Sequence, residues 1–176
     1  DQINIVELQG TVGSAPANDR YDGFREILTD YPEYEITQTQ SGNFTRTEGK
    51  QVMEAFLKAD GDNIDVLYAH NDDMAIGAIN AAYELGLKVP KDISIVGFDD
   101  IEMATTVWPP LTTVRQPIRA MAAAAMRLLT SPGPTHCTPS SRPVDLSATI
   151  FMTRSLAPMK PGLSGAAYTT DTVSKP

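Results

Sequence analysis

A polar or aromatic side chain follows each of the five short apolar or β-rich runs in the first two thirds of the chain. In chain order, these side chains are Arg20, Phe44, Asn71, Asp99 and Gln116. Guanidinium, carboxylate and amide groups each form several hydrogen bonds, and an aromatic face packs against C–H groups. A sugar presents both adjacent hydroxyls and a C–H face. The set therefore suits a sugar better than an acyl or phosphoryl group.

The elements that must position these side chains can be read from periodicity. Apolar or alternating runs predict strands at 3–8, 34–40, 64–69, 93–98 and 111–115, and helical spacing predicts helices at 17–28, 45–59, 74–85 and 118–129. Strands that alternate with helices of about 10–15 residues predict βαβ units and a parallel sheet. Ligands of such sheets bind beyond the carboxyl ends of the strands, so we expect the five side chains to meet at one edge.

Each of these residues also has an ordinary structural interpretation, which the pattern alone leaves open. In chain order, they fit a surface arginine at Arg20, a core residue at Phe44, a helix N-cap at Asn71, a turn at Asp99–Asp100 and a loop at Gln116. Five such residues after five consecutive strands are harder to explain separately. A binding cleft is the hypothesis that accounts for all of them.

Composition excludes several classes of function. The 176 residues carry 22 acidic side chains against 14 lysines and arginines, for a net charge of -8. This balance argues against a nucleic-acid surface, which needs a basic patch. No apolar run approaches the roughly 20 residues of a membrane span. Cys137 is the single cysteine, so an internal disulfide and a multi-cysteine metal cage are excluded.

Three short motifs resemble ligand sites but fail on spacing. Gly42 and Gly49 are too far apart for a phosphate loop, and 60–63 has Ile64 where a calcium loop needs an oxygen. His136–Cys137 lacks a second ligand pair for zinc. We therefore expect neither a metal nor a cofactor.

An enzyme is the weakest of the functional hypotheses. Asp72 and Asp99 are the carboxylates that a hydrolase on this framework would use. No acid–base pair with a nucleophile accompanies them. We therefore expect a binding protein.

Longer segments resemble known families. Residues 6–24, 40–56 and 67–81 (VELQGTVGSAPANDRYDGF, QSGNFTRTEGKQVMEAF and LYAHNDDMAIGAINA) resemble periplasmic sugar-binding proteins of ABC importers, of the galactofuranose- and ribose-binding kind. Residues 86–129 (GLKVPKDISIVGFDDIEMATTVWPPLTTVRQPIRAMAAAAMRLL) resemble the effector-binding core of LacI-type repressors. The two groups share the type I periplasmic-binding-protein fold, in which two α/β lobes close on a ligand.

The resemblance implies a role for each candidate residue. Arg20 would bond ring or hydroxyl oxygens, Phe44 would stack on the sugar face, Asn71 and Asp99 would bond hydroxyls, and Gln116 would add a bond at the hinge. It leaves Asp72 as the expected cap of the following helix. These are the positions that the strand-end argument selects independently.

The resemblance also implies a domain layout. Residues 1–110 match the second, flavodoxin-like lobe, and 111–130 match a strand and helix that cross into a first lobe missing from this chain. Residues 131–176 hold seven of the 13 prolines, with a closing strand expected at about 148–153 in an otherwise flexible tail.

Two functional hypotheses follow. The first is a substrate-binding component of a bacterial ABC sugar importer, periplasmic, with a monosaccharide and the importer's membrane subunits as partners. The second is the effector domain of a LacI-type regulator, cytoplasmic and homodimeric, which would reach operator DNA through a domain outside this chain. Neither requires this chain to contact nucleic acid directly. An upstream signal peptide would favour the first, and an upstream helix-turn-helix the second.

Overall fold

A five-stranded parallel sheet organises the computed structural model, which describes residues 2–130. The spatial order of its strands is β2-β1-β3-β4-β5. The strands are β1 (Ile3–Gln9), β2 (Tyr34–Ser41), β3 (Val66–Ala69), β4 (Ser94–Asp99) and β5 (Thr112–Arg115), and the helices are α1 (Ala15–Leu28), α2 (Arg46–Asp60), η1 (Gly61–Asn63), α3 (Asp72–Glu84), α4 (Glu102–Thr106) and α5 (Ile118–Thr130).

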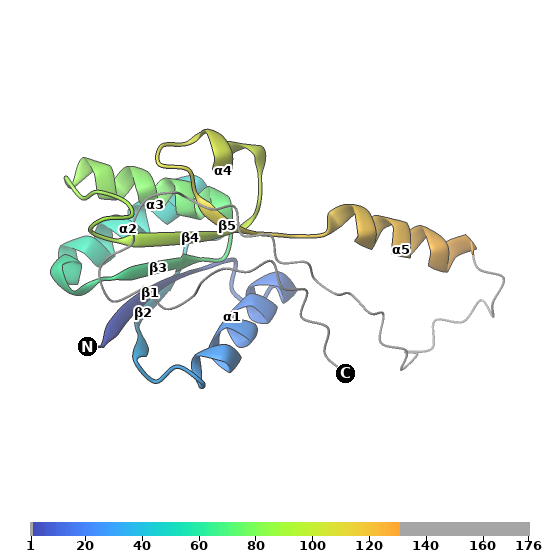
Figure 1. Cartoon of the computed structure of the whole chain (residues 1–176), viewed down its shortest axis with the longest axis horizontal. Helices are drawn as coiled ribbons and strands as arrows, with labels where there is room; N and C mark the ends of the chain where they lie inside the picture. Colours follow the sequence, from blue (N-terminus) through green and yellow to red (C-terminus); the bar gives the residue numbers. More distant parts are fainter. Residues whose placement is uncertain (1, 131–176) are drawn as a thin grey trace.

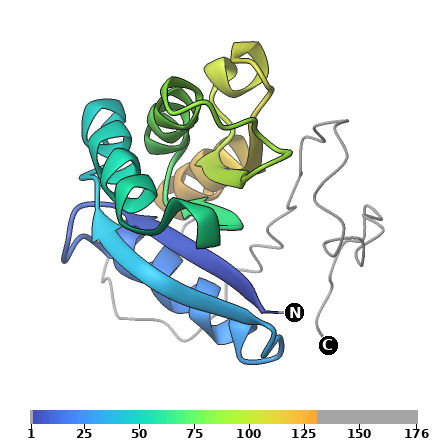
Figure 2. The ribbon, with the colours of Figure 1, turned by 90° about the vertical axis from the view of Figure 1, so that its left-hand side faces the viewer.

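Helices cover both faces of this sheet. Helices α2 and α3 lie on one face and α1 lies on the other, while α5 extends beyond the sheet (Figure 1). Figure 2 shows the sheet between these helices after a turn of 90° about the vertical axis. Because β1 is followed by α1 and β3 by α3, the chain leaves these neighbouring strands toward opposite faces. In sheets of this kind, ligands bind beyond the carboxyl ends of the strands at such a point.

The main core lies between the sheet and the α2–α3 layer. Val6 and Leu8 of β1, Leu67 of β3 and Met53 and Phe56 of α2 are all buried there. Their burial follows from strand alternation and from the single apolar face of α2. The packing of α2 and α3 against the sheet therefore holds the strands in place on this face.

Two glycines allow α2 and α3 to pack closely. A Cβ built on Gly77 of α3 would lie less than 3.0 Å from the backbone of Arg46 and Lys50, and one on Gly49 of α2 would meet the backbone of Met74 equally closely. Gly49, which the sequence offered as a poor match to a phosphate loop, is therefore a helix-packing residue.

The face covered by α1 is thinner and more polar. Ala17 is the buried residue of α1. The ring of Phe24 stacks on Tyr68 of β3 at a centroid distance of 4.1 Å. Tyr68 also lies 5.3 Å from the imidazole of His70. With so little apolar area, α1 depends on polar contacts to hold its place.

The predicted parallel α/β sheet is confirmed, with strand bounds shifted by one or two residues. The fifth strand, which the resemblance placed at a crossing into a first lobe, lies in this sheet. Strand β5 pairs with β4, from Val96 opposite Thr112 to Asp99 opposite Arg115, because its β-branched residues complete this sheet. Helix α4 was not predicted, since its five residues are too few to show a period.

The expected closing strand at about 148–153 and the expected tail lie outside the described residues. Within residues 2–130, no helix has the length and apolar character needed to cross a membrane.

The α2–α3 contact predicts a sensitive position. We expect Gly77→Ala to lower the free energy of unfolding by about 1–3 kcal/mol, because the new Cβ collides with backbone that cannot rotate away. Gly23→Ala, at an open position of α1, is the control and should be neutral or slightly stabilising. Urea unfolding of both variants measures this, and equal stability of the two would contradict the packing account.

Candidate functional site

All five candidate residues converge at the carboxyl edge of the sheet. They lie in or beside the segments that follow β1, β2, β3, β4 and β5, as the parallel topology requires. Contacts connect them into one cluster, here called the edge cluster (Arg20, Phe44, Asn71, Asp99 and Gln116). The sequence therefore predicted their convergence correctly.

Arg20 is the centre of the edge cluster. One guanidinium nitrogen donates to the carbonyl oxygen of His70, and the other donates to Oδ1 of Asp99 at 3.0 Å. The guanidinium lies 4.2 Å from the ring centroid of Phe98 and 5.6 Å from that of Phe44. With its side chain only 13% exposed, Arg20 is a fixed part of the edge rather than a free surface arginine.

Phe44 and Asn71 are joined directly. The side-chain amide of Asn71 donates to the carbonyl oxygen of Phe44 at 3.0 Å, while its Oδ1 accepts from the backbone N–H of Met74 at 3.0 Å. Asn71 is therefore the N-cap of α3 and also holds the turn that carries Phe44. Phe44 is half-buried against the core, as its core interpretation requires, and the rest of its surface is exposed.

Asp99 connects β4 with β5 and α1. Its Oδ1 accepts from Nε2 of Gln116 as well as from Arg20. The side chain of Asp99 is 27% exposed, so the carboxylate remains accessible at the edge.

Asp72 does not have the capping role expected of it. Asn71 provides the cap, and Asp72 is fully buried in the first turn of α3. Its carboxylate accepts from Oγ1 of Thr113 and from the backbone N–H of Ile101 at 2.9 Å. Burial raises the pKa of Asp72 despite these hydrogen bonds. Asp72 thus fastens β5 and the segment after β4 to α3.

The backbone is strained at this edge. Asn43 (φ 50°), Phe44 (φ 62°), Asp99 (φ 122°) and Asp100 (φ 59°) have positive φ values without being glycine. Such conformations cost free energy and collect at functional sites. Two of these residues follow β2 and two lie at or just after the end of β4, so the strain is concentrated at the carboxyl edge on both sides of β1 and β3.

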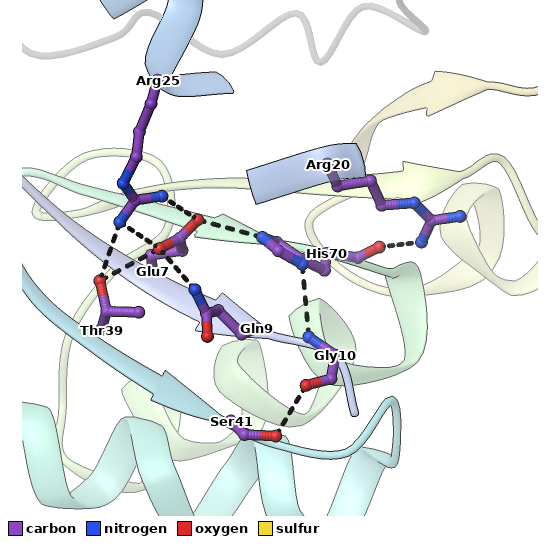
Figure 3. Close-up of polar contacts among 8 residues, drawn as sticks. All are labelled: Glu7, Gln9, Gly10, Arg20, Arg25, Thr39, Ser41 and His70. Carbon is purple, nitrogen blue, oxygen red and sulfur yellow. Dashed lines mark hydrogen bonds and ion pairs between the residues drawn. The ribbon is translucent and has the colours of Figure 1, made fainter. Parts of the chain in front are cut away.

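A buried polar network beneath the edge was missed from the sequence. Glu7 of β1 is fully buried, and its two carboxylate oxygens accept from the guanidinium of Arg25 at 2.9 and 2.8 Å (Figure 3). Nε2 of His70 lies 3.0 Å from Glu7, and Oγ1 of Thr39 donates to Glu7 at 3.1 Å. This network joins β1, β2, β3 and α1.

The network assigns the imidazole of His70. Nδ1 of His70 accepts from the backbone N–H of Gly10 at 3.3 Å, so the ring proton is on Nε2 and is donated to Glu7. The carbonyl oxygen of His70 accepts from Arg20, so this one residue connects the network to the edge cluster.

The charge of Glu7 is strongly stabilised. Burial by itself would raise its pKa, but hydrogen bonds from His70 and Arg25 and the charge of Arg25 outweigh this. The pKa of Glu7 falls from 4.5 to about 2. The buried carboxylate is therefore ionised and paired.

A glutamate within the apolar run at 3–8 was the available signal for this network, since a charge in a buried strand requires a partner. The contact of Phe98 with the Arg20 guanidinium was also missed, because the pattern places Phe98 at the end of a core strand.

The edge cluster coincides neither with a group of metal-binding side chains nor with a hollow. Among residues 2–130, no group of three His, Cys, Asp or Glu side chains could hold a metal ion. Two hollows lie elsewhere, one beside α1 near Tyr21 and one near Pro109, and no edge-cluster residue lines either. The edge cluster therefore lies outside both hollows.

Comparisons with known proteins agree with this geometry. Residues 3–151 match the family model described as "Periplasmic binding protein-like domain". The galactofuranose-binding protein YtfQ of Escherichia coli (strain K12) is 56% identical over 106 residues, which are 57% of this chain and 33% of that protein. The chain thus spans about a third of the length of this curated relative.

Solved structures include both a binding protein and a repressor. A galactofuranose binding protein has a TM-score of 0.66 and 40% identity, over 76% of this chain and 48% of its own. The Lac repressor bound to ONPG has a TM-score of 0.67 and 32% identity, over 73% of this chain and 39% of its own. Both resemblances found in the sequence are therefore confirmed.

The paired charge of Glu7 predicts an acid-sensitive fold. Because its pKa is lower in the folded chain, Glu7 stabilises the fold above pH 4.5, and this contribution of about 3 kcal/mol disappears as the pH falls toward 2. Urea unfolding between pH 7 and pH 2 should show that Glu7→Gln is less stable than the wild type at pH 7. Its free energy of unfolding should also depend less on pH. Glu33→Gln, at an exposed position, is the control. If the wild type and Glu7→Gln lose the same free energy of unfolding between pH 7 and pH 2, this assignment is contradicted.

Proposed function

The chain belongs to the family of periplasmic binding protein-like domains, and on that premise we propose that its edge cluster binds a monosaccharide reversibly, without bond chemistry. The observation that carries the proposal is the connected set of Arg20, Asp99 and Gln116, with the Phe44 ring beside Arg20. This set combines fixed donors, an accessible carboxylate and an aromatic face.

Four of the five edge-cluster residues have a proposed role that their contacts support. Arg20 is immobilised by His70 and Asp99, so its remaining N–H donors can meet a sugar oxygen at little entropic cost. Asp99 can accept from a hydroxyl, and Gln116 can exchange its bond to Asp99 for one to the ligand. The ring of Phe44 offers a face for sugar C–H groups.

The proposed site is one half of a two-lobed cleft. The chain covers a third of its curated relative and about half of a related solved chain, so a second lobe would supply the facing wall of the site. Closure of two lobes about a hinge would then surround the sugar. Gln116 lies between β5 and α5, where such a hinge would pass.

Within this proposal, the whole protein is the substrate-binding component of a bacterial ABC sugar importer, working in the periplasm with the importer's membrane subunits. The 56% identity to a galactofuranose-binding protein supports this role over others. A furanose or a related monosaccharide is the ligand class that we propose.

A second candidate is the effector domain of a LacI-type transcriptional regulator, which would be cytoplasmic and dimeric. The likeness to the Lac repressor, with 32% identity over 73% of this chain, favours it. The gene segment upstream of Asp1 distinguishes the two candidates. A signal peptide there supports the importer role, and a helix-turn-helix supports the regulator.

Titration followed by NMR tests the sugar site, since one wall of a cleft is expected to bind at about millimolar strength. The probes are D-ribose, L-arabinose, methyl β-D-galactofuranoside and methyl β-D-galactopyranoside. For a sugar that binds the wild type, Arg20→Ala and Asn71→Ala should weaken binding about tenfold or more, because each removes hydrogen bonds to ligand oxygens.

Matched controls separate binding from folding. Arg127→Ala and Asn80→Ala remove the same groups at exposed positions and should keep wild-type affinity. Asn71→Ser retains a capping oxygen on α3 and should still lose affinity. Full affinity in both Arg20→Ala and Asn71→Ala would show that the sugar binds elsewhere.

A further inference from the structure

Gly10 is held in place from two sides. It follows β1 and is buried, its N–H donates to Nδ1 of His70 at 3.3 Å, and its carbonyl oxygen accepts from Oγ of Ser41 at 2.7 Å (Figure 3). His70 is in turn fixed by Glu7. The backbone of Gly10 is therefore clamped between the ends of β2 and β3.

The ring of Phe44 lies directly on this glycine. A Cβ built on Gly10 would come less than 3.0 Å from three carbons at the far end of the Phe44 ring. Carbon atoms in contact are normally about 3.5–4.0 Å apart. The ring thus occupies the space that any side chain at position 10 would need.

Backbone conformation does not explain the glycine. The glycines with positive φ in the described part of the chain are Gly13 and Gly86, and Gly10 is not among them. Alanine can therefore adopt the backbone conformation of Gly10. What requires glycine at this position is the approach of the Phe44 ring.

We infer that Gly10 is a specificity-determining residue, which sets the depth of the site by letting the Phe44 ring rest on the backbone. This inference rests on the proposed monosaccharide site. The carbonyl oxygen of Phe44 is bound by Asn71, so both backbones are fixed and the ring is the part that must yield to a Cβ. Alanine at position 10 would lift the ring by on the order of 1–2 Å.

A raised ring changes what the site accepts. A sugar stacked on Phe44 would move with the ring, and its hydroxyls would leave the range in which they bond the guanidinium of Arg20 and the carboxylate of Asp99. Gly10 acts through Phe44 and does not itself need to touch the ligand. Its effect on affinity must therefore vanish when the ring is absent.

The first measurement needs no sugar. In NMR spectra of the wild type, protons of the Phe44 ring should show NOEs to the Gly10 Hα protons. In Gly10→Ala, the ring resonances and the Arg20 Hε resonance should shift, while the His70 ring resonances and the hydrogen bond from the amide of residue 10 to Nδ1 of His70 are retained. The reverse pattern, with a displaced backbone and an unmoved ring, would overturn the inference.

The second measurement is a double-mutant cycle with methyl β-D-galactofuranoside and methyl β-D-galactopyranoside. Gly10→Ala should weaken binding of the preferred probe about tenfold or more, and should have no effect in the Phe44→Ala background. Gly23→Ala is the control and should bind like the wild type.

The outcomes separate the inference from the proposed function. If the wild type binds and Gly10→Ala costs the same affinity with and without the Phe44 ring, the inference alone fails. If Gly10→Ala binds the probe with the affinity of the wild type, the inference about Gly10 also fails while the sugar site stands. If the wild type binds neither these probes nor the free pentoses, the sugar site fails and the role of Gly10 in it falls as well.

Discussion

The buried carboxylate of Glu7 is the constraint on which the arrangement of the edge depends. A charge without solvent must be paired, and Glu7 is paired by Arg25 from α1, His70 from the end of β3 and Thr39 from β2. This pairing therefore fixes the positions of β1, β2, the end of β3 and α1 relative to one another. The α1 face has little apolar area, so this pairing, together with the stacking of Phe24 on Tyr68, fixes the helix that carries Arg20.

The same pairing extends to the edge cluster through His70. Its imidazole holds Gly10, on which the Phe44 ring rests, and its carbonyl oxygen holds Arg20. On the opposite side, Asp72 fastens β5 and the segment that follows β4. Two buried carboxylates thus support the edge from β1 and from the start of α3, and the strained residues Phe44 and Asp99 lie on either side of them, after β2 and at the end of β4. A rigid wall of this kind loses little entropy when it binds a ligand.

The sequence predicted the parts of this architecture that depend on period and order. Parallel strands must end at one edge, so Arg20, Phe44, Asn71, Asp99 and Gln116 could be placed together before their contacts were known. Three-dimensional pairing could not be predicted in this way. Glu7 stood within an apolar run with no sign of its partners, the capping role fell to Asn71 because only the loop geometry decides between adjacent residues, and β5 joined this sheet through contacts that no period encodes.

If the edge cluster is a monosaccharide site, a crystal structure of the chain with methyl β-D-galactofuranoside should show the sugar at the carboxyl edge. We expect its C–H face on Phe44 and its hydroxyls bonded to Arg20, Asn71 and Asp99. A sugar bound in the hollow beside Tyr21 of α1, with the edge cluster unoccupied, would contradict the account.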